Sequence, residues 1–487
     1  MKKCLACILL LALLLGLFSG CAAPAGEEQA PQQTPSAAPE QERDEPVTAP
    51  EQPALAVELS GGFDPYSTTS SCNRFLLELV LEPLFSVSPA GQAEAVLAES
   101  WNVSADGLTT LVTLKPDIVL HDGTVLTAEA VVSSVEKAMA GSYYHGRFYA
   151  LQSVRSQGER TVEFVTTVAY ECFPLLLDIP IASGSDTLPV GTGPYLWNGT
   201  ESLLPHAGWH GEVYPAGKQA ITLQPVSDAT ALRDGFQFGG VSAVSVDPNG
   251  TGSVGYNGEY ELWKVPTAQM QYVGFNRNRG VFSSEKIRSA VTWAVDRQSI
   301  VDEDMAGFGV PAVLATLPGS VWDDPQLSEG YGFEPEKLTA VLPAGAAATM
   351  IVCGENAQRT ASARRIAQQL TACGLTTTLK TLTAAQFRSA LASGSYDLYY
   401  AEVRLSPNLD LTPFFAEGGE LSYGGLADET LLQLCQLTLN NRGNAYDLQR
   451  RILSRGLVCP VAFKANACYL HLNTFELLSP SLGGWLW

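Results

Sequence analysis

Basic residues and histidines are scarce in this sequence. Its 487 residues include 29 Lys and Arg against 50 Asp and Glu, a formal net charge of −21 at pH 7, and only 5 histidines. A nucleic-acid partner requires clustered Lys and Arg to neutralise phosphates, and the basic residues here are scattered along the chain. The charge balance therefore excludes a nucleic-acid-binding protein.

Motifs for catalysis, cofactor binding and metal binding are missing as well. No G-x-S-x-G occurs that would form a nucleophile elbow. His206 and His210 are four residues apart, but proline and glycine neighbours prevent the helix that would align them on one metal. Residues 250–255 spell G-x-G-x-x-G, yet Asn257 and Gly258 follow where a phosphate-binding helix should begin, so we predict a loop there. We expect a protein that is not an enzyme and that has neither a cofactor nor a metal site.

Long hydrophobic runs are confined to the N-terminus. Two lysines precede the apolar residues 4–18, a run too short to span a bilayer, and this order predicts a signal peptide over residues 1–20. The sequence LFSGC that ends at Cys21 resembles a bacterial lipobox, which implies lipidation of Cys21; an ordinary secretory signal is the alternative. Residues 21–54 are rich in Pro and Glu and lack a core-forming cluster, so we predict a disordered linker behind the lipid.

The cysteines do not form a recognisable framework. Seven of the ten follow Cys21, an odd number that cannot all pair, and none of the seven lies in a Cys-x-x-Cys or a zinc-type cluster. We expect mostly buried free thiols, with Cys459 and Cys468 as the one pair to test for a bridge.

Residues 98–139 combine a turn, a strand and a helix. Asp106-Gly107 tolerates the positive φ of a hairpin turn, and the β-rich residues 108–114 follow it. Thr127 is well placed to cap a helix whose apolar residues recur at helical spacing up to Met139. The segment is a supersecondary unit without a catalytic motif.

The second half of the chain predicts an α/β lobe. Ser284 precedes a helical pattern, in which we interpret Arg288 and Arg297 as solvated or capping charges. From residue 349 strands and helices alternate, which favours βαβ units with a largely parallel sheet. Ligands of such sheets bind at the carboxyl ends of strands, so the loop 402–410 should face a cleft. The predicted strands are residues 350–353, 376–382 and 397–402, and the predicted helices are residues 361–373 and 384–392.

The order of several motifs resembles one protein family. AESW at residues 98–101, HDGT at 121–124 and LTAE at 126–129 are followed by GTGPY at 191–195 and YVGFN at 272–276. In this order they resemble the family 5 extracellular solute-binding proteins, the peptide- and nickel-receptor class of bacterial ABC importers. The resemblance extends from about residue 63 to the C-terminus.

The resemblance implies a fold and its division along the chain. It implies a two-lobed α/β receptor of the periplasmic-binding-protein type (type II, Venus flytrap), with an extra small α+β domain inserted in the first lobe. Lobe I would comprise residues 55–85, 191–270 and 461–487, the small domain residues 86–190, and lobe II residues 271–460.

The same resemblance implies a function. It implies a lipid-anchored receptor, outside the cell membrane, that binds a small solute by lobe closure without chemistry and delivers it to an ABC permease with ATPase subunits. A peptide is the first expectation for the solute, and the receptor is expected to be a monomer. A receptor for a metal chelate, haem or an oligosaccharide is the alternative, followed by a secreted hydrolase or a surface interaction protein.

The loop after residue 402 departs from peptide-binding relatives. Those proteins resemble one another in a Trp followed by an Asp that receives the amino group of the peptide, and this chain has Val403 and Ser406 at those places. Glu402, Arg404 or Asp410 would supply replacement charges. Arg404 is the sharpest candidate, because a guanidinium suits a carboxylate or a phosphate; a surface Arg on a loop is the alternative.

Other candidate ligand contacts come earlier in the chain. Tyr66 and the hydroxyl run around Thr68 precede a predicted helix over residues 75–84, and they either contact the ligand or cap that helix. Peptide-binding relatives present an aromatic side chain from the small domain, a role open to four aromatic residues between 143 and 149. The predicted ligand-binding residues are Tyr66, Thr68, Tyr144, Tyr149, Tyr272, Glu402, Arg404, Ser406 and Asp410.

Overall fold

The computed structural model describes most of the chain. The described residues are 52–88, 90–144, 146–184, 187–211 and 219–471. The predicted signal peptide, Cys21, nearly all of the linker and the final residues 472–487 of the predicted lobe I lie outside these ranges. Within the described ranges, no helix combines the length and the apolar character needed to cross a bilayer.

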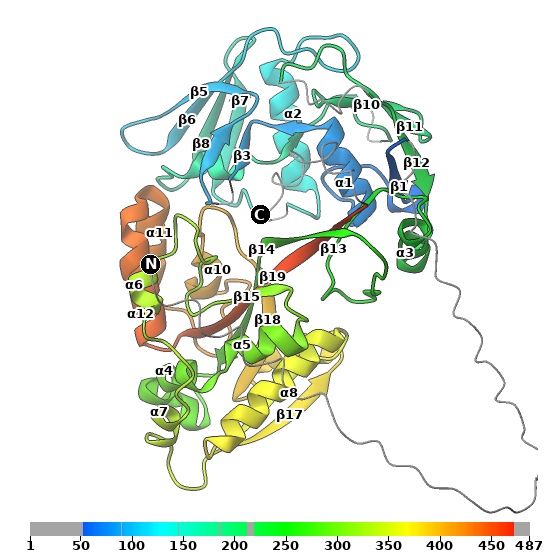
Figure 1. The fold of residues 1–487 in the computed structure, drawn as a ribbon. Coiled ribbons are helices and arrows are strands. Elements are labelled where there is room, and N and C mark those ends of the chain that lie inside the picture. Colours follow the sequence, from blue (N-terminus) through cyan, green and yellow to red (C-terminus); the bar gives the residue numbers. More distant parts are fainter. Residues whose placement is uncertain (1–51, 89, 145, 185–186, 212–218, 472–487) are drawn as a thin grey trace, which may run out of the picture. The chain divides into compact units, whose positions relative to one another are not determined.

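A mixed sheet of eleven strands organises the described residues (Figure 1). Its strands are β1 (Ala54–Val57), β10 (Tyr195–Asn198), β11 (Ser202–Pro205), β12 (Ile221–Pro225), β13 (Ala243–Val246), β14 (Glu261–Phe275), β15 (Gly309–Pro311), β16 (Ala347–Cys353), β17 (Thr376–Leu382), β18 (Leu398–Arg404) and β19 (Val458–Leu470). Their order is β10-β11-β12-β1-β13-β19-β14-β18-β16-β17, with β15 paired to β19 beside this path. β1 is parallel to β12 and β13, and β16 is parallel to β17 and β18. We call the first group lobe I (β1 and β10–β13) and the second lobe II (β16–β18).

The antiparallel strands β14 and β19 join the two lobes. The first part of β14 pairs with the end of β19 beside β13, and its second part pairs with β18. Between Pro266 and Met270 the register against β19 shifts, and there Thr267 Oγ1 donates a 3.0 Å hydrogen bond to the carbonyl of Lys464. Irregular pairing at a proline is expected because proline has no N–H to give to the ladder. The first four residues of the motif at 272–276 lie in the part of β14 that pairs with β18.

Lobe II has the predicted alternation of strands and helices. α8 (Ala357–Ala372) and α9 (Ala384–Ser393) connect its parallel strands. α8 begins four residues earlier than predicted, because the side chain of Asn356 accepts a 2.7 Å hydrogen bond from the backbone N–H of Arg359 and caps the helix. Gly374 follows α8 with a φ of 99°, a conformation that glycine adopts without strain.

Arg288 and Arg297 were interpreted as solvated or capping charges, and the solvated alternative is wrong. Both lie on the helices α4 (Glu285–Ala294) and α5 (Arg297–Ser299), and their exposed fractions are only 2% and 7%. Arg288 donates to the carbonyls of Phe282 and Gly456, and Arg297 to those of Ala312, Pro460 and Thr292. The two guanidinium groups are buried because they satisfy backbone carbonyls at the ends of neighbouring segments.

A second, antiparallel sheet lies apart from the main sheet (Figure 1). Its order is β5 (Ala98–Val103), β6 (Thr109–Leu114), β8 (Thr161–Thr166), β7 (Leu151–Ser156), and α2 (Ala128–Ala140) packs on it. We call β5–β8 with α2 the small sheet. The predicted cap of α2 is confirmed, since Thr127 Oγ1 accepts from the backbone N–H of Ala130 at 3.3 Å. Two further sheets have two short strands each. One pairs β2 (Glu82–Pro83) with β9 (Pro180–Ile181), and the other pairs β3 (Phe85–Val87) with β4 (Ala93–Ala95).

The remaining helices cover the two lobes and their junctions. The longer ones are α1 (Ser71–Val80), α3 (Ala229–Gln237), α11 (Glu429–Asn440) and α12 (Ala445–Ser454), and the short ones are α6 (Pro325–Ser328), α7 (Glu336–Thr339), α10 (Thr412–Phe415), the 3₁₀ turns Leu59–Gly61, Phe173–Leu176, Gly280–Ser283 and Arg442–Asn444, and the π turn Ile300–Asp304. α1 begins four residues before the predicted start because Ser70 caps it.

The cysteine prediction is confirmed in its main point. All seven cysteines within the described residues are free thiols. Cys459 and Cys468, the pair selected for a bridge, are both buried and unbonded to each other. They lie on the same strand, β19, nine positions apart, so an extended backbone holds their side chains too far from each other to pair.

Candidate functional site

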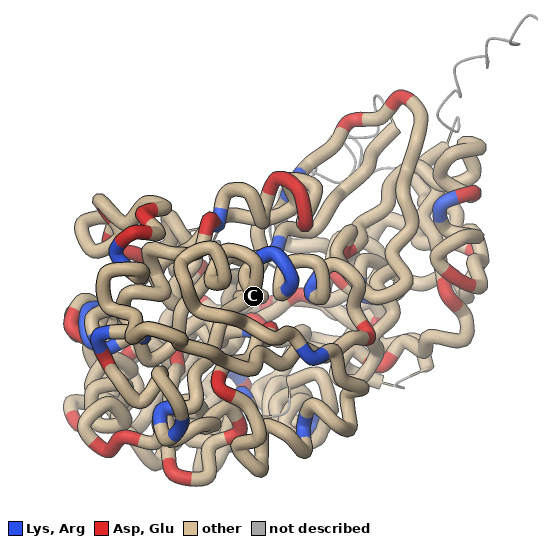
Figure 2. The backbone as a smooth tube through the Cα atoms, turned by 90° about the horizontal axis from the view of Figure 1, so that it is seen from below, with Lys and Arg blue, Asp and Glu red and all other residues tan. Residues whose placement is uncertain are grey.

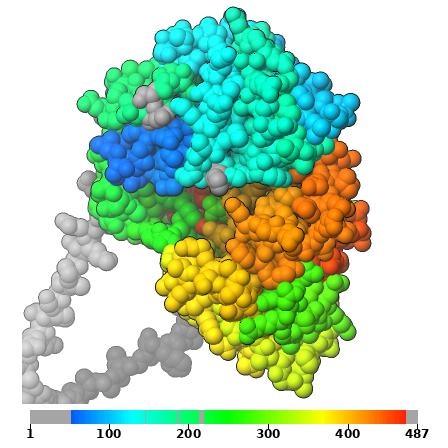
Figure 3. All heavy atoms as spheres, turned by 180° about the vertical axis from the view of Figure 1, so that it is seen from behind, coloured from blue at the N-terminus to red at the C-terminus, as the bar shows by residue number. Residues whose placement is uncertain are grey.

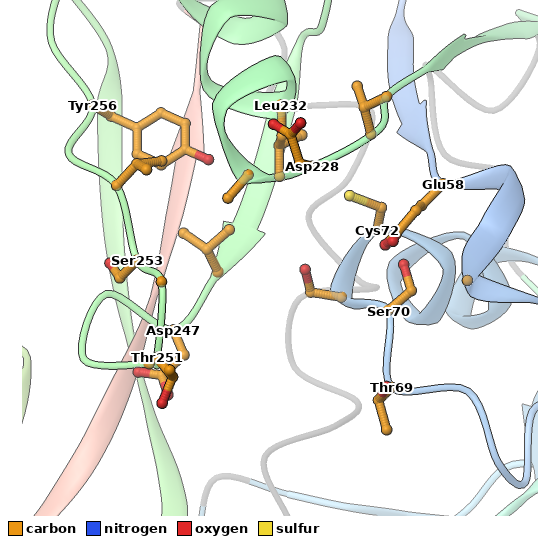
Figure 4. A pocket seen from close by; sticks show the side chains of 18 residues that line it. Glu58, Thr69, Ser70, Cys72, Asp228, Leu232, Asp247, Thr251, Ser253 and Tyr256 are labelled. Carbon is orange, nitrogen blue, oxygen red and sulfur yellow. The ribbon is translucent and has the colours of Figure 1, made fainter. Parts of the chain in front are cut away.

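A cavity of about 480 Å³ lies in lobe I, where three parallel strands end (Figure 4). Glu58 follows β1, Val226 follows β12 and Asp247 follows β13. Carboxyl ends of parallel strands are where α/β sheets bind ligands. The cavity is lined by Glu58, Gly61, Thr69, Ser70, Ser71, Cys72, Val226, Asp228, Ala229, Leu232, Val246, Asp247, Gly250, Thr251, Gly252, Ser253, Val254 and Tyr256.

Two helices begin at the wall of this cavity. The Ser70 side chain caps α1 by accepting a hydrogen bond from the backbone N–H of Asn73 at 3.4 Å. The Asp228 side chain caps α3 by accepting hydrogen bonds from the backbone N–H groups of Thr230 and Ala231, both at 2.9 Å. The N–H of Ala231 and the hydroxyl of Ser227 hold the pKa of the Asp228 carboxyl below its usual range. The polar groups at this wall are therefore fixed by the helix starts.

The opposite wall is formed by the loop of residues 250–255. This is the segment that spells G-x-G-x-x-G and that was predicted to be a loop. Residues 250–255 contain neither helix nor strand, as predicted, and they line the cavity. The same loop reaches lobe II: Asn356 Nδ2 donates to the carbonyl of Asn249 at 2.8 Å, and Thr251 Oγ1 lies 3.5 Å from the carbonyl of Glu355. Because Asn356 also caps α8, the loop connects the cavity to the start of a lobe II helix.

A buried lysine joins the cavity to the strands between the lobes. Lys464, on β19, has a side chain only 3% exposed and forms an ion pair with Asp247, which lines the cavity. Its Nζ also lies 3.4 Å from Glu402 Oε2 on β18 of lobe II. Glu402 accepts a further 2.9 Å hydrogen bond from Gln271 on β14. The predicted site residue Glu402 is thus part of an internal charge network that spans both lobes.

Tyr66 and Thr68 lie beside the cavity without lining it. They are 2% and 5% exposed. The Tyr66 hydroxyl donates to the carbonyl of Pro180 at 3.1 Å, and burial raises its pKa. Thr68 Oγ1 donates to the carbonyl of Gly61 at 2.7 Å. The neighbouring hydroxyl residues Thr69, Ser70 and Ser71 line the cavity instead.

Tyr272 is also buried, with 1% of its surface exposed. Its ring packs edge-to-face on Tyr399 and Phe414 in an apolar cluster of lobe II. Ser406 lies in the loop after β18, where its carbonyl accepts a 3.0 Å hydrogen bond from the N–H of Leu409.

Two further predicted residues, Tyr149 and Asp410, meet where the small sheet contacts lobe II. The Tyr149 hydroxyl lies 3.2 Å from Thr412 Oγ1, which is 2.6 Å from Asp410 Oδ1. The buried Tyr170 hydroxyl accepts a 3.0 Å bond from Asn408 and lies 3.5 Å from Asp410 Oδ2. Burial raises the pKa of Asp410. Sequence reasoning missed Tyr170 and Asn408, because only the fold brings positions so distant in the chain together.

Arg404 and Tyr144 lie at the same junction. Arg404 donates a hydrogen bond to the hydroxyl of Tyr143, and its guanidinium carbon is 5.1 Å from the centroid of that ring. Tyr144 is 4% exposed, with the guanidinium carbon of Arg147 5.0 Å from its ring centroid. The structure therefore brings Arg404 and Tyr144 to neighbouring positions, and it places Asp410 with Tyr149.

The outer surface is hollowed close to the strands that join the lobes. Figure 3 shows a recess between the blue and green residues of lobe I and the yellow residues of lobe II, with the red of β19 visible inside it. Among the described residues no group of three or more His, Cys, Asp or Glu has a geometry that would hold a metal ion.

The sequence matches a family model over residues 92–416, more than half of the chain. The family is described as bacterial extracellular solute-binding proteins, family 5. Among characterised relatives, the glutathione-binding protein GsiB of Salmonella typhi is 25% identical over 300 residues, which cover 57% of this chain and 58% of that protein. The match thus spans little more than half the length of that relative.

Solved structures share the fold at low sequence identity. The ABC transporter substrate-binding protein CtaP of Listeria monocytogenes has a TM-score of 0.70 at 18% identity, covering 87% of this chain and 94% of that chain. The unliganded open form of MppA, a periplasmic murein tripeptide-binding protein, has a TM-score of 0.74 at 14% identity, covering 90% and 96%. The predicted fold of two α/β lobes of the periplasmic-binding-protein type is confirmed.

Proposed function

The chain belongs to the bacterial extracellular solute-binding proteins of family 5, and from this premise we propose that it captures small peptides outside the cytoplasmic membrane for an ABC importer. Capture is by closure of the two lobes on the solute, without chemistry on it. A solute drives closure to the extent that it binds the closed arrangement more tightly than the open one. The closed lobes then dock on a permease whose ATPase subunits supply the energy.

The observation that carries this proposal is the cavity at the ends of β1, β12 and β13. It faces strand ends and helix starts in lobe I, and its second wall is the loop that bonds to Asn356 at the start of α8 in lobe II. A solute held there contacts lobe I directly and reaches lobe II through one loop. That arrangement supports coupling between solute binding and lobe closure.

The chemistry of the lining favours a peptide. Ser70, Ser71, Thr251 and Ser253 offer hydroxyl groups that both donate and accept, which suits peptide N–H and C=O groups. Among the described residues the Glu58 carboxylate has no ion-pair partner, so it is available to an amino group. The names of GsiB and MppA, glutathione and murein tripeptide binding, point to the same ligand class.

Attachment to the membrane is the second part of the proposal. Cys21 carries the lipid after removal of residues 1–20, and residues 21–54 separate the lipid from the lobes. A cysteine with two acyl chains, as the lipobox resemblance implies, holds a protein at a bilayer far longer than one myristoyl chain does. We also propose that residues 86–190 form a small domain inserted in lobe I. The small sheet supports this division because its strands do not pair with the main sheet.

A second candidate function is a receptor for a non-peptide solute such as a metal chelate, haem or an oligosaccharide. The observation in its favour is the pair Val403 and Ser406, which stand where peptide-binding relatives have the Trp and the Asp that receives the amino group. Without that Asp the peptide amino group needs another partner.

A thermal-shift screen of the full chain separates these functions. The panel contains di- to octapeptides, nickel chelates, haem and oligosaccharides. A ligand at a hundred times its dissociation constant adds about 2.7 kcal/mol to stability, which is easily measured. We expect shifts with peptides; a shift with a non-peptide alone would move the function to the second candidate, and no shift with any peptide would refute the first.

A further inference from the structure

Three arginines converge on two neighbouring tyrosines at the junction of α1, the small sheet and lobe II. The guanidinium carbon of Arg74 lies 3.4 Å from the ring centroid of Tyr143, and that of Arg404 lies 5.1 Å from it. The guanidinium carbon of Arg147 lies 5.0 Å from the ring centroid of Tyr144. The chain has only 29 basic residues, and Figure 2 shows them spread thinly over the backbone. A cluster of three is therefore unusual here.

Two buried carboxyl groups, those of Asp178 and Glu78, pair with Arg147 or lie on the element that carries Arg74. Asp178, only 3% exposed, forms an ion pair with Arg147. Glu78 lies one turn after Arg74 on α1, and its charge acts on Arg74. Burial raises the pKa of both Asp178 and Glu78, so each carries its negative charge less readily than an exposed acid. Arg404 forms no ion pair with any described residue, although its side chain is exposed.

The three guanidinium charges act on the Tyr143 hydroxyl. Burial, the largest single influence, raises the pKa of this phenol, but the charges of Arg404, Arg74 and Arg147 outweigh it and leave the pKa below the usual value. A phenol in that field is a strong hydrogen-bond donor to an anion. Its hydroxyl now accepts a hydrogen bond from Arg404, and both groups would turn toward a shared anion.

The cluster is connected to the cavity through α1. Asn73 precedes Arg74 and accepts a 2.9 Å hydrogen bond from the backbone N–H of Glu58, which lines the cavity. Arg404 ends β18 in lobe II, whereas Tyr143 follows α2 of the small sheet. An anion at this place would contact segments from both sides of the junction, and so would favour their approach.

We infer that Arg404, together with Arg74 and Tyr143, forms a subsite for a carboxylate of the bound solute. This inference rests on the proposed function and specifies its ligand: the solute carries an acidic group, as the C-terminus of a peptide does. A guanidinium binds a carboxylate through two parallel N–H donors, which an ammonium does not match. The subsite would bind the end of a peptide opposite to its amino group, for which Glu58 is the proposed partner.

Calorimetric titration of the full chain with trialanine and with its C-terminal amide tests the subsite. The two probes differ by one carboxylate, and the unmodified chain should bind the acid at least about tenfold more tightly, the value of one hydrogen-bonded charge. Arg404→Gln should bind both probes equally, and Arg404→Lys should retain part of the preference. Tyr143→Phe should reduce the preference by less than Arg404→Gln does.

A matched control removes the same charge elsewhere in lobe II. Arg388→Gln changes an exposed residue of α9 and should keep the full preference for the acid. If Arg404→Gln also keeps it, or if the unmodified chain does not distinguish acid from amide, the subsite is refuted while peptide capture stands. Arg404 is exposed, so the variant is expected to fold, and its melting temperature verifies this.

A second experiment tests the subsite without relying on the binding of trialanine. Failure of trialanine to bind would itself count against peptide capture. Sodium acetate and inorganic phosphate are titrated against chloride at constant ionic strength, with the melting temperature as readout. Acetate should stabilise the unmodified chain and the Arg388→Gln variant, but not Arg404→Gln. Equal responses in all three proteins overturn the subsite, and a response to phosphate alone overturns its assignment to a carboxylate.

Discussion

Replacing Lys464 by methionine tests the charge network that links the cavity to the strands between the lobes. The lysine side chain is 3% exposed, and its partners Asp247 and Glu402 have side chains 29% and 20% exposed. Removal of one partner from a fully buried ion pair costs about 3–5 kcal/mol, because an unpaired charge stays behind. Both carboxylates keep some contact with water, so we expect Lys464→Met to lower the free energy of unfolding by about 2–3 kcal/mol.

The design separates the charge effect from the loss of packing. The triple variant Lys464→Met, Asp247→Asn, Glu402→Gln removes all three charges, and it should recover at least half of the loss because no unpaired carboxylate remains. Lys380→Met, at an exposed position of β17, should change stability by less than about 0.5 kcal/mol.

The assay is urea unfolding of the full chain, followed in parallel by tryptophan fluorescence and far-UV circular dichroism. A single free energy is assigned only where the two transitions coincide, since a two-lobed chain need not unfold in one step. A triple variant as unstable as Lys464→Met would refute the electrostatic reasoning. So would a single variant as stable as the Lys380→Met control.

Three further predictions concern the junction and the cavity. Tyr170→Phe leaves Asn408 Nδ2 without its acceptor, and should cost about 1–3 kcal/mol in the same urea assay; no measurable loss would show that another group takes that bond. Asp410→Asn tests the carboxyl group of Asp410, because burial raises the pKa of this group in the folded protein. The native chain should therefore lose stability as the pH rises from below the normal carboxyl pKa through the raised one, and the variant should lack that part of the pH dependence; identical pH profiles would contradict it. Glu58→Gln should weaken the binding of trialanine about tenfold but leave that of its N-acetyl derivative unchanged, as measured by calorimetry; equal losses for both peptides would remove Glu58 as the partner of the amino group.

The alternating strands and helices of lobe II were predictable because each depends on local signals. The β-branched run of β17, the cap at Thr383 and the glycine after α8 all act within a few residues of the element they define. The misplaced start of α8 has the same local origin, since Asn356 was not recognised as its cap.

The candidate site was predictable only to within its neighbourhood. The hydroxyl run after Tyr66 was identified, but whether Thr68 or Thr69 faces the cavity depends on a turn that sequence periodicity does not describe. Residues 250–255 were correctly predicted as a loop, and their failed motif gave no sign that they line a cavity.

Lys464 was missed although the sequence carried a signal for it. It is the only charged residue in the apolar strand β19, and a lone charge in a buried strand needs a partner. Which partner could not be read, because Asp247 and Glu402 are separated from it by 217 and 62 positions. The contact of Arg404 with Tyr143 spans 261 positions and was unreadable for the same reason.

The place of β19 in the sheet has a consequence for biosynthesis. It is the last strand of the described chain, yet it lies in the middle of the sheet, between β13 and β14, and it also pairs with β15. A ribosome must therefore synthesise every other described strand before β19 can take its place between β13 and β14. Sheets closed by such distant contacts form slowly, because a long loop loses its freedom before the contacts are made. The nascent chain thus remains incompletely folded until β19 has been synthesised.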